Sequence, residues 1–527
     1  SGIVDGNFAR LPSFSWRLQG TYKQGGNIRS PDYYLKNTGI KEYNFSWAAG
    51  YEKENLGIEV FYSQFNTDIG IFSASHIGNL TDLEKAFEAD EPLETADFTY
   101  EIDRPWQQIE HELFKAKAYI LTGNSGKLSI TYARQYNKRL EYDKDPPRND
   151  SLAALNLPAL QFEITTHTGD LTWEHNWYRS LKGSFGISVI DQGNTYEGRY
   201  FIPNFKKYGG GIFWIERWKP LDSKIELEAG VRYDHIFQEI FLWQDDMIIS
   251  PEYTYNNVSG SIGGIYKFSK DLLVKVNAGT AWRPPNVNEM YSNGLHHGAA
   301  AVEIGDTSLV AEQAYNISAA VEYTVDKLSF TVDAYYNYIN NFIYLKPVQP
   351  PTLTIRGAFP TFRFSQVDAT LSGVDVTIHY QLPLNLNITS KASILRAYNQ
   401  TASEYLVQMP ADRFENSIEY RFRENDRFSD AYVSLTLLSV LEQTRVPENS
   451  DYVPPPAGYN LLGIQAGFSV PLGKQKMKIG IGVDNLLNTS YRDYMNRFRY
   501  FTDEMGTNLS LRITVPFAIS GQNRSNK

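Results

Sequence analysis

The chain has 527 residues, no cysteine and a net charge of −10, so neither disulfides nor thiolate metal sites can form. The sequence contains no basic tract and no stripe of interleaved basic and aromatic residues, which argues against nucleic acid as a partner. Aromatic residues make up 14% of the chain, a composition that suits surfaces between lipid headgroups and water. No apolar run approaches the ~18 residues of a spanning helix, but a membrane barrel needs none, because its strands alternate.

Alternation with a period of two is the dominant pattern along the chain. In residues 328–344 the apolar and aromatic side chains fall mainly on even positions, Phe342 and Tyr344 included, and the polar ones mainly on odd positions. Residues 384–394 and 508–517 repeat the pattern. Alternation of this length predicts half-buried strands. The polar faces suit a wet lumen and the apolar faces suit lipid.

The segments between these strands alternate in length. Short turns are predicted at residues 52–55, 122–127, 180–182, 220–223, 270–271, 326–327, 383, 424–426 and 472–473. Long polar loops are predicted at residues 24–39, 67–106, 142–158, 194–205, 241–253, 284–308, 346–362, 401–410, 444–457 and 488–505. Inside the loop 67–106, the capping-box sequence Thr81-Asp82-Leu83-Glu84 predicts a short helix after Thr81.

Counting between these connections gives about twenty strands, each near the ~10 residues that a tilted strand needs to cross a bilayer. We place the first at residues 12–23 and the last at residues 506–517. Short turns at one end and long loops at the other are typical of outer-membrane barrels, in which the turns are periplasmic. The predicted fold class is therefore all-β, a transmembrane antiparallel up-and-down β-barrel with long extracellular loops.

Several segments, taken in order and spacing, resemble the TonB-dependent outer-membrane receptor family. These segments are residues 227–234 (LEAGVRYD), 257–264 (NVSGSIGG), 278–285 (AGTAWRPP), 289–291 (EMY), 305–309 (GDTSL) with Glu312, 371–375 (LSGVD), 483–488 (VDNLLN) with Tyr491, and 506–509 (GTNL). The chain departs from the family pattern at Thr307, where proline is usual, and at the pair before Glu312.

The resemblance implies a bacterial outer-membrane receptor rather than an enzyme, with residues 1–527 forming its barrel domain. Family barrels have about 22 strands, so we expect one hairpin, and the family's N-terminal plug domain, to lie outside this chain. The resemblance also implies a lipid bilayer, the TonB-ExbB-ExbD energy complex as a partner through the missing N-terminal part, and no intrinsic cofactor. The expected ligand is a transported iron chelate, haem or zinc.

Histidines in the predicted outer loops are the candidate metal ligands, because neutral imidazole binds zinc, copper and haem iron. His296 and His297 lie in the loop 284–308, and His76 in the loop 67–106 could complete a site. Adjacent residues of an extended segment point to opposite sides, so we expect only one of His296 and His297 to face a given ligand. The alternative is that they are ordinary polar loop residues. The resemblance places both in the interval that carries the ligand histidine of haem-uptake members.

Candidate ligand-binding residues of a second kind are cationic or aromatic. Arg283 and Tyr291 lie in the family-like segment, where Arg283 could contact an anion or pair with a carboxylate inside the barrel. Arg492, Arg497 and Arg499 lie among aromatic residues of the last long loop, which suits an anionic, ring-bearing chelate. The alternative for these three is a solvated loop at the membrane edge.

The leading functional hypothesis is active uptake of a metal or metal chelate, either a ferric siderophore or haem. A free-metal importer, for zinc or another metal, is the first alternative. A passive porin is the second alternative, and an outer-membrane enzyme the third. Against an enzyme, the sequence has no Gly-x-Ser-x-Gly, no phosphate-binding glycine-lysine loop and no His-Glu-x-x-His motif.

Overall fold

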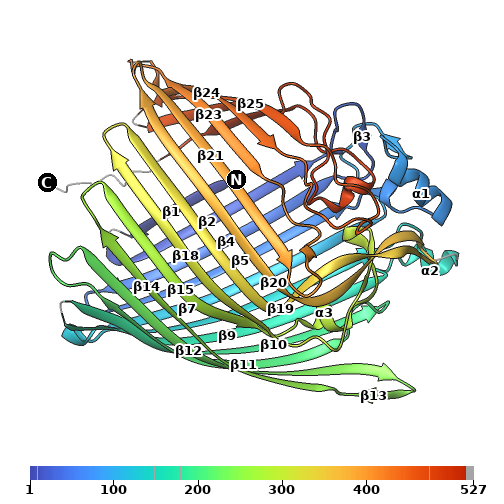
Figure 1. Cartoon of the computed structure of the whole chain (residues 1–527), viewed down its shortest axis with the longest axis horizontal. Helices are drawn as coiled ribbons and strands as arrows, with labels where there is room; N and C mark the ends of the chain where they lie inside the picture. The colour runs from blue at the N-terminus through green and yellow to red at the C-terminus, as the bar shows by residue number, and fades with distance from the viewer. Residues whose placement is uncertain (9, 147–148, 179, 426, 474, 518–527) are drawn as a thin grey trace.

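The computed structural model describes residues 1–527 except 9, 147–148, 179, 426, 474 and 518–527. Within this part of the chain, the strands form one 25-stranded sheet and a separate two-stranded sheet. Four strands of the large sheet, β13, β16, β17 and β22, are short, and the other 21 form the wall of a barrel (Figure 1). None of the described helices is long and apolar enough to span a membrane.

Each wall strand runs antiparallel to the next wall strand along the chain, as the alternating turns and loops predict. The wall strands are β1 (Gly2–Phe8), β2 (Leu11–Gly25), β4 (Ile40–Lys53), β5 (Leu56–Gly70), β7 (Trp106–Leu121), β8 (Lys127–Tyr142), β9 (Leu160–Tyr178), β10 (Leu181–Gly198), β11 (Asn204–Trp218), β12 (Ile225–Gln244), β14 (Glu252–Lys267), β15 (Leu272–Arg283), β18 (Glu312–Val325), β19 (Leu328–Thr354), β20 (Gly357–Leu382), β21 (Leu386–Asn399), β23 (Arg413–Arg421), β24 (Ser429–Val440), β25 (Tyr459–Leu472), β26 (Gln475–Asp484) and β27 (Asn508–Thr514).

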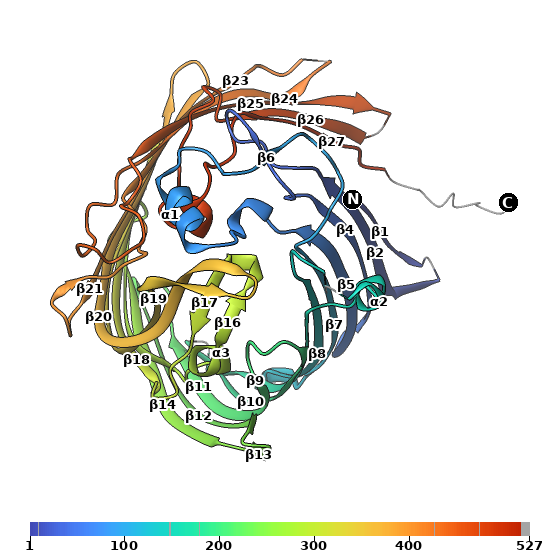
Figure 2. The same cartoon turned by 90° about the vertical axis from the view of Figure 1, so that its right-hand side faces the viewer.

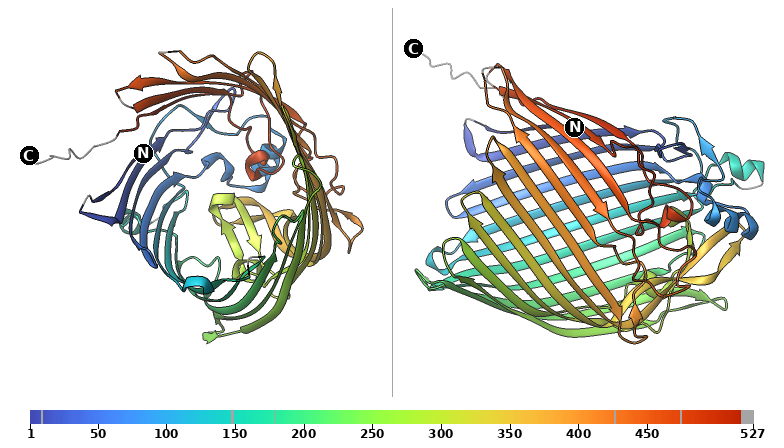
Figure 3. Two further views of the ribbon diagram at one scale, coloured as in Figure 1. Left: turned by 90° about the vertical axis from the view of Figure 1, so that its left-hand side faces the viewer. Right: turned by 45° about the horizontal axis from the view of Figure 1, so that its top comes forward.

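The remaining elements lie in the connections, mainly at the long-loop end (Figure 1). They are β3 (Tyr34–Leu35), η1 (Ser73–Ser75), α1 (Leu80–Glu88), β6 (Thr95–Ala96), η2 (Gly123–Ser125), α2 (Asp150–Ala154), β13 (Met247–Ile249), α3 (Val287–Tyr291), β16 (Asn293–His296), η3 (His297–Ala299), β17 (Ala301–Ile304), β22 (Glu404–Tyr405) and η4 (Arg497–Tyr500). Figure 2 looks into the barrel from the long-loop end and shows α1, α3 and the β16–β17 hairpin surrounded by the wall. Figure 3 (left) shows the same interior from the short-turn end.

The alternation expected of a membrane barrel is visible in directly paired residues. Ile317 of β18 pairs with Tyr336 of β19, and they are 52% and 48% exposed on the outer, apolar face. Asn316 and Asn337, one position away, pair with each other and join their side chains by a hydrogen bond on the other face. The apolar face therefore points outward to lipid, and the amide-rich face lines the lumen.

Two sequence-based boundaries differ from the structure. The wall has a further strand, β1, before the predicted first strand at residues 12–23, which corresponds to β2. Residues 346–362, predicted as a polar loop, belong mostly to the long strands β19 and β20. Pro350 and Pro351 are tolerated in β19, because they lie in a register shift between Val348 and Thr352 and leave the ladder of hydrogen bonds for which proline has no donor.

A second register shift in β19, between Ile339 and Phe342, changes the face of the residues that follow it. Up to Tyr338, even residues of β19 pair with even residues of β20, whereas Phe342 pairs with Val367. Phe342 and Tyr344 then pack against a buried cluster around Ala369 and Leu406. The expectation that they share the face of Tyr336 is wrong, because one extra residue inverts the alternation.

The short helix predicted after Thr81 is present, but its N-cap lies two residues earlier than expected. Helix α1 begins at Leu80, and the side chain of Asn79 accepts a hydrogen bond from the backbone N–H of Asp82. Thr81 is therefore inside the first turn. Asn79 can take this role because asparagine is as good an N-cap residue as serine or aspartate.

Long loops from separate parts of the chain pack together at the outer end of the barrel around an apolar core, which we call the cap core. Its buried members are Tyr33, Leu35, Phe72, Ala74, Ile77, Leu83, Ala86, Ala300, Ala301, Ala358, Phe362, Tyr500 and Phe501. Because these residues come from five connections or strand ends, the cap core fixes the relative positions of the loops that carry the candidate site residues.

A candidate metal site among the outer loops

Two of the three candidate histidines meet although they are far apart in the sequence. His76 follows η1, and His297 begins η3 beyond the β16 strand. The Nε2 atom of His76 lies 2.9 Å from Nδ1 of His297. Their rings are nearly parallel, with an interplanar angle of 8° and centroids 5.1 Å apart. We refer to these two residues as the histidine pair.

Both outer nitrogens of the histidine pair are held by neighbouring polar groups. Ser75 Oγ lies 3.3 Å from Nδ1 of His76, and Asp143 Oδ1 lies 2.5 Å from Nε2 of His297. Asp143 also forms an ion pair with Arg356, which lies in the turn between β19 and β20. Four separate segments are therefore joined at the pair, and each imidazole has a fixed orientation.

Burial determines the charge state of His76. The side chains are in the interior, with His297 only 1% and His76 only 5% exposed. Burial and the adjacent His297 lower the pKa of His76 to about 3, so that its imidazole is neutral at physiological pH. Burial raises the pKa of Asp143, but hydrogen bonds and charges from His297 and Arg356 outweigh it and hold that pKa well below its usual range.

Imidazole nitrogens are suitable metal ligands, and a carboxylate behind one of the two rings orients it as in carboxylate–histidine–metal arrangements. Among the described residues, however, no group of three His, Cys, Asp or Glu side chains is arranged to hold a metal ion. The histidine pair could thus supply two nitrogen ligands, and a metal bound there would take its other ligands from a chelate that carries it.

His296 turns away from the pair, as the opposite directions of adjacent extended residues predict. Its Nδ1 atom lies 3.1 Å from Oε1 of Glu303 on β17. The same carboxylate oxygen accepts a hydrogen bond of 2.9 Å from Arg497. Burial raises the pKa of Glu303, but His296 and Arg497 together lower it below its usual value. The structure therefore joins two candidate residues, His296 and Arg497, through a carboxylate that the sequence analysis did not select.

The other two arginines of the last long loop have partners of their own. Arg499 is buried, forms an ion pair with Asp451, and lies over the rings of Tyr494 and Tyr500 at 4.8 and 4.4 Å. Arg492 donates to Asp503 at 2.8 Å and to backbone carbonyls at the end of α1. Both side chains hold loops together in this structure.

Arg283 and Tyr291 belong to a separate set of contacts at the base of α3. The guanidinium of Arg283 donates to both oxygens of Glu312, at 2.7 and 3.0 Å, and to Glu289 at 2.8 Å. The hydroxyl groups of Tyr291 and Tyr253 lie 2.6 Å apart, and burial followed by this hydrogen bond raises the pKa of Tyr291. Arg283 is thus engaged by two carboxylates at the end of its strand.

Sequence reasoning missed Asp143, Glu303 and Arg356. Each lies in or beside a predicted long loop, and each gains its role from a residue far away in the chain. Asp143 contacts His297 and Arg356, so no local spacing could have identified it. The acidic and basic residues of a polar loop look alike in the sequence until the partners are known.

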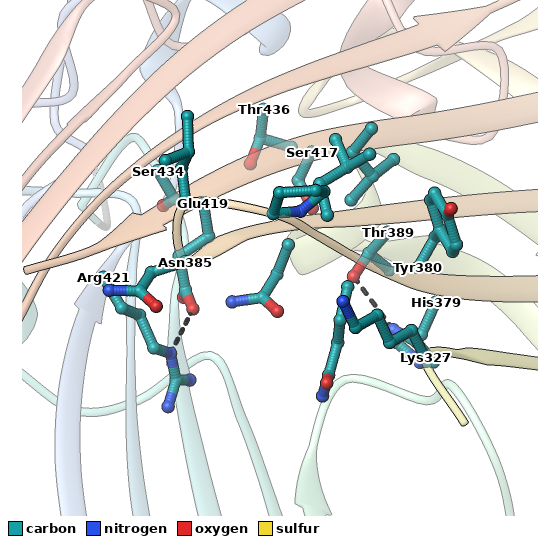
Figure 4. Close-up of a pocket in the computed structure, with 16 residues that line it drawn as sticks. Lys327, His379, Tyr380, Asn385, Thr389, Ser417, Glu419, Arg421, Ser434 and Thr436 are labelled. Carbon is teal, nitrogen blue, oxygen red and sulfur yellow. Dashed lines mark hydrogen bonds and ion pairs between the residues drawn. The ribbon is translucent and has the colours of Figure 1, made fainter.

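A large hollow lies at the opposite, short-turn end of the barrel and contains none of the candidate residues. It measures about 820 Å³ and is lined by β20, β21, β23 and β24 together with the turn at residues 383–385. Figure 4 shows its polar side chains, with Arg421 donating to Glu419 at 2.6 Å and His379 beside Thr389 at 2.9 Å. A smaller cavity of about 330 Å³, lined in part by His296 and Glu303, lies on the inner side of the wall at the outer end.

Comparisons with known proteins agree on the kind of barrel. A family model described as "TonB dependent receptor-like, beta-barrel" matches residues 4–486. The copper transporter OprC is 15% identical over 97% of this chain and 77% of its own, with a TM-score of 0.74.

Two iron-related structures are also similar. The FrpB iron transporter from Neisseria meningitidis (F3-3 variant) is 14% identical, with a TM-score of 0.70 over 97% of this chain and 78% of its own. The ferric yersiniabactin uptake receptor FyuA from Yersinia pestis is 11% identical, with a TM-score of 0.64 over 97% of this chain and 75% of its own. At identities this low, the similarity shows that these structures and this chain share a fold.

Proposed function

Because the chain belongs to the TonB-dependent receptor β-barrel family of outer-membrane transport receptors, we propose that it actively imports a metal chelate, either a ferric siderophore or haem. Energy would come from the TonB complex of the inner membrane, acting through parts of the receptor beyond this barrel. The barrel wall and its outer loops bind the cargo, and the histidine pair contributes ligands to its metal.

The observation that carries this proposal is the arrangement of His76 and His297. Two imidazole nitrogens face each other at 2.9 Å, and Ser75 and Asp143 hold the nitrogens on the far sides. Histidine suits iron in haem, copper and zinc. The similar structures, described as a copper transporter, an iron transporter and a ferric chelate receptor, support the same class of cargo.

Import of a free metal such as zinc is the second candidate, favoured by the same histidine pair. Zinc commonly takes three protein ligands and keeps an open position. The pair provides two nitrogens, and Asp143, which now contacts His297, would have to release it to become a third ligand. A chelate that brings its own ligands needs no such rearrangement, which is why it is the first candidate.

Uptake by cells tests the proposal. Cells that produce the full-length receptor, and matched cells without it, are given haem, ferric siderophore or Zn²⁺, and cell-associated metal is measured by mass spectrometry. We expect receptor-dependent iron uptake that is abolished by a proton uncoupler and reduced by His297→Ala. His379→Ala, at the short-turn end, is the matched control and should transport normally.

The other outcomes discriminate among the candidates. Receptor-dependent uptake of zinc alone would select the second candidate. Uptake that survives the uncoupler would indicate a passive porin, and uptake of none of the three would contradict metal import.

A further inference from the structure

The cavity of about 330 Å³ beside His296 lies between the barrel wall and the segment that contains α3, β16 and β17. Figure 2 shows this segment inside the barrel, next to β10, β11 and β12. The wall contributes side chains from β8 to β12, and the inner segment contributes residues 286–288, His296 and Glu303. The barrel wall thus lines one side of the cavity and the inner segment lines the other.

Aromatic rings form part of its lining. Phe162 and Phe201 are buried and pack at 63° with ring centroids 6.5 Å apart, and Phe205 is buried beside them. The ring of Phe201 also lies 5.3 Å from the ring of His296. Edges and faces of several rings around a small space favour a flat, apolar group as its occupant.

The cavity also contains a cation without a counter-ion. Lys207 is half-buried in the lining, and no hydrogen bond or ion pair joins its ammonium group to any described residue. Its neighbours across the strands are the amides Gln192 and Gln238, which carry no charge. An ammonium group that loses part of its hydration without gaining a partner is costly, so this position favours an anion.

Arg139 adds positive charge at the same place. Its guanidinium lies over the ring of Phe162 at 5.5 Å and pairs with Glu141, while its Nε atom is buried without a hydrogen-bond partner. The one carboxylate of the lining, Glu303, is already neutralised by Arg497 and faces His296. The lining therefore has an excess of positive charge together with flat apolar walls.

We propose that this cavity is a binding subsite for a planar aromatic carboxylate, with the carboxylate on Lys207 and the ring among Phe162, Phe201 and Phe205. The inference rests on the proposed function in one respect, because it assigns the aromatic acid to the organic part of the imported chelate. A cavity of about 330 Å³ is at the lower end of small-molecule sites, so it fits a one- or two-ring acid. The metal centre of a larger chelate stays outside it.

The test is a fluorescence titration of the purified full-length receptor in detergent with 2-naphthoate, which is aromatic, anionic and free of metal. We expect saturable binding that falls roughly tenfold or more in Lys207→Met, because a charge-assisted hydrogen bond is lost. Lys207→Arg should retain binding. Lys206→Met is the matched control, since Lys206 is the preceding residue of β11 and points to the other side of the wall.

Competitors identify which features of the ligand matter. The neutral analogue 2-naphthalenemethanol and the ringless anions acetate and phosphate should each bind much more weakly than 2-naphthoate. The proposal is overturned if the wild type does not bind 2-naphthoate, if Lys207→Met binds as well as the wild type, or if either kind of competitor binds equally well. The heat-dependent migration of each variant on a gel verifies that its barrel is folded.

The outcome is separable from that of metal uptake. A receptor that binds 2-naphthoate through Lys207 but imports none of the tested metals would retain the subsite and contradict the proposed function. A receptor that imports iron but does not bind 2-naphthoate would retain the proposed function and contradict the subsite.

Discussion

The buried imidazole of His76 makes the outer loops sensitive to acid. Its pKa of about 3 in the folded receptor is below the ~6.5 of an exposed histidine, so the unfolded loop binds a proton first as the pH falls. Stability from this group is therefore complete above pH ~6.5 and is lost as the pH decreases from there toward 3. Asp143, whose pKa is lowered, adds a loss in the same direction at still lower pH.

We predict that local stability around His76 falls by about 2 kcal/mol between pH 7.5 and pH 5. Hydrogen exchange of the backbone amides in residues 72–77, corrected for the intrinsic effect of pH and measured with a chelator present, is the readout. The titratable and polar groups around His76 are His297, Asp143, Lys144 and Ser75. Equal protection at the two pH values would contradict the assignment of a neutral, buried His76.

The candidate site could be predicted only in part at this scale. The opposite directions of the His296 and His297 side chains follow from their adjacency in an extended segment, and the structure shows them with separate partners. The meeting of His76 with His297 was a possibility that no spacing could establish, because 221 positions separate the two residues. Their supporting groups, Asp143 and Glu303, depend on tertiary contacts for which a polar loop carries no local signal.

Helix α1 offers a test at the level of a single element. Asn79 provides its N-cap, so Asn79→Ala should destabilise the helix by about 1 kcal/mol. Thr81→Ala, the matched control two residues later, should have little effect, because Thr81 is inside the helix. Hydrogen exchange across residues 80–88 distinguishes the two. A larger loss of protection in Thr81→Ala than in Asn79→Ala would show that Thr81, and not Asn79, is the N-cap.

The tip of the β19–β20 hairpin is held over the histidine pair by the ion pair of Arg356 with Asp143 and by a β-bridge between Ile77 and Ala358. We predict that Arg356→Gln costs about 1–2 kcal/mol locally, which is roughly a five- to thirtyfold loss of protection from exchange in residues 353–358. Arg363→Gln, in the following strand β20, is the control. Unchanged protection in Arg356→Gln would show that the bridge alone holds the tip.

Elements were predictable to the extent that local chemistry decides them. The turn at residues 326–327 is where the sequence places it, because Asp326 adopts a positive φ of 44° between two alternating strands. The hairpin at residues 346–362 was not predictable, because the segment contains four prolines, which usually end strands, and here a register shift accommodates Pro350 and Pro351. Likewise, the inversion of Phe342 and Tyr344 depends on a bulge that alternation alone does not reveal.

At the scale of the whole molecule, the barrel requires an apolar outer face and a polar lumen. Ile262 is 64% exposed near the middle of β14, on the outer face. Ile262→Lys should destabilise the barrel in lipid vesicles by about 2–4 kcal/mol. Ser261→Lys, one residue earlier and on the lumen face, should be tolerated, since glycines 230 and 279 pair with it and leave space. Equal effects in urea unfolding would contradict this orientation of the wall.

The outer loops complete the molecule as a receptor, because the cap core joins α1, the β16–β17 hairpin and the β19–β20 tip around the histidine pair. Cargo that reaches His76 and His297 must therefore displace or pass the hairpin tip. Whether the histidine pair binds metal therefore decides the role of the outer loops.

The measurement that tests this most directly is an equilibrium titration of the purified full-length receptor with haem, followed by absorbance and repeated with Zn²⁺ by calorimetry. We predict binding that falls at least tenfold in both His76→Ala and His297→Ala and persists in His296→Ala, since His296 faces Glu303 instead. Binding that is unchanged in the first two variants, or lost only in His296→Ala, would contradict the assignment of the histidine pair as the metal site.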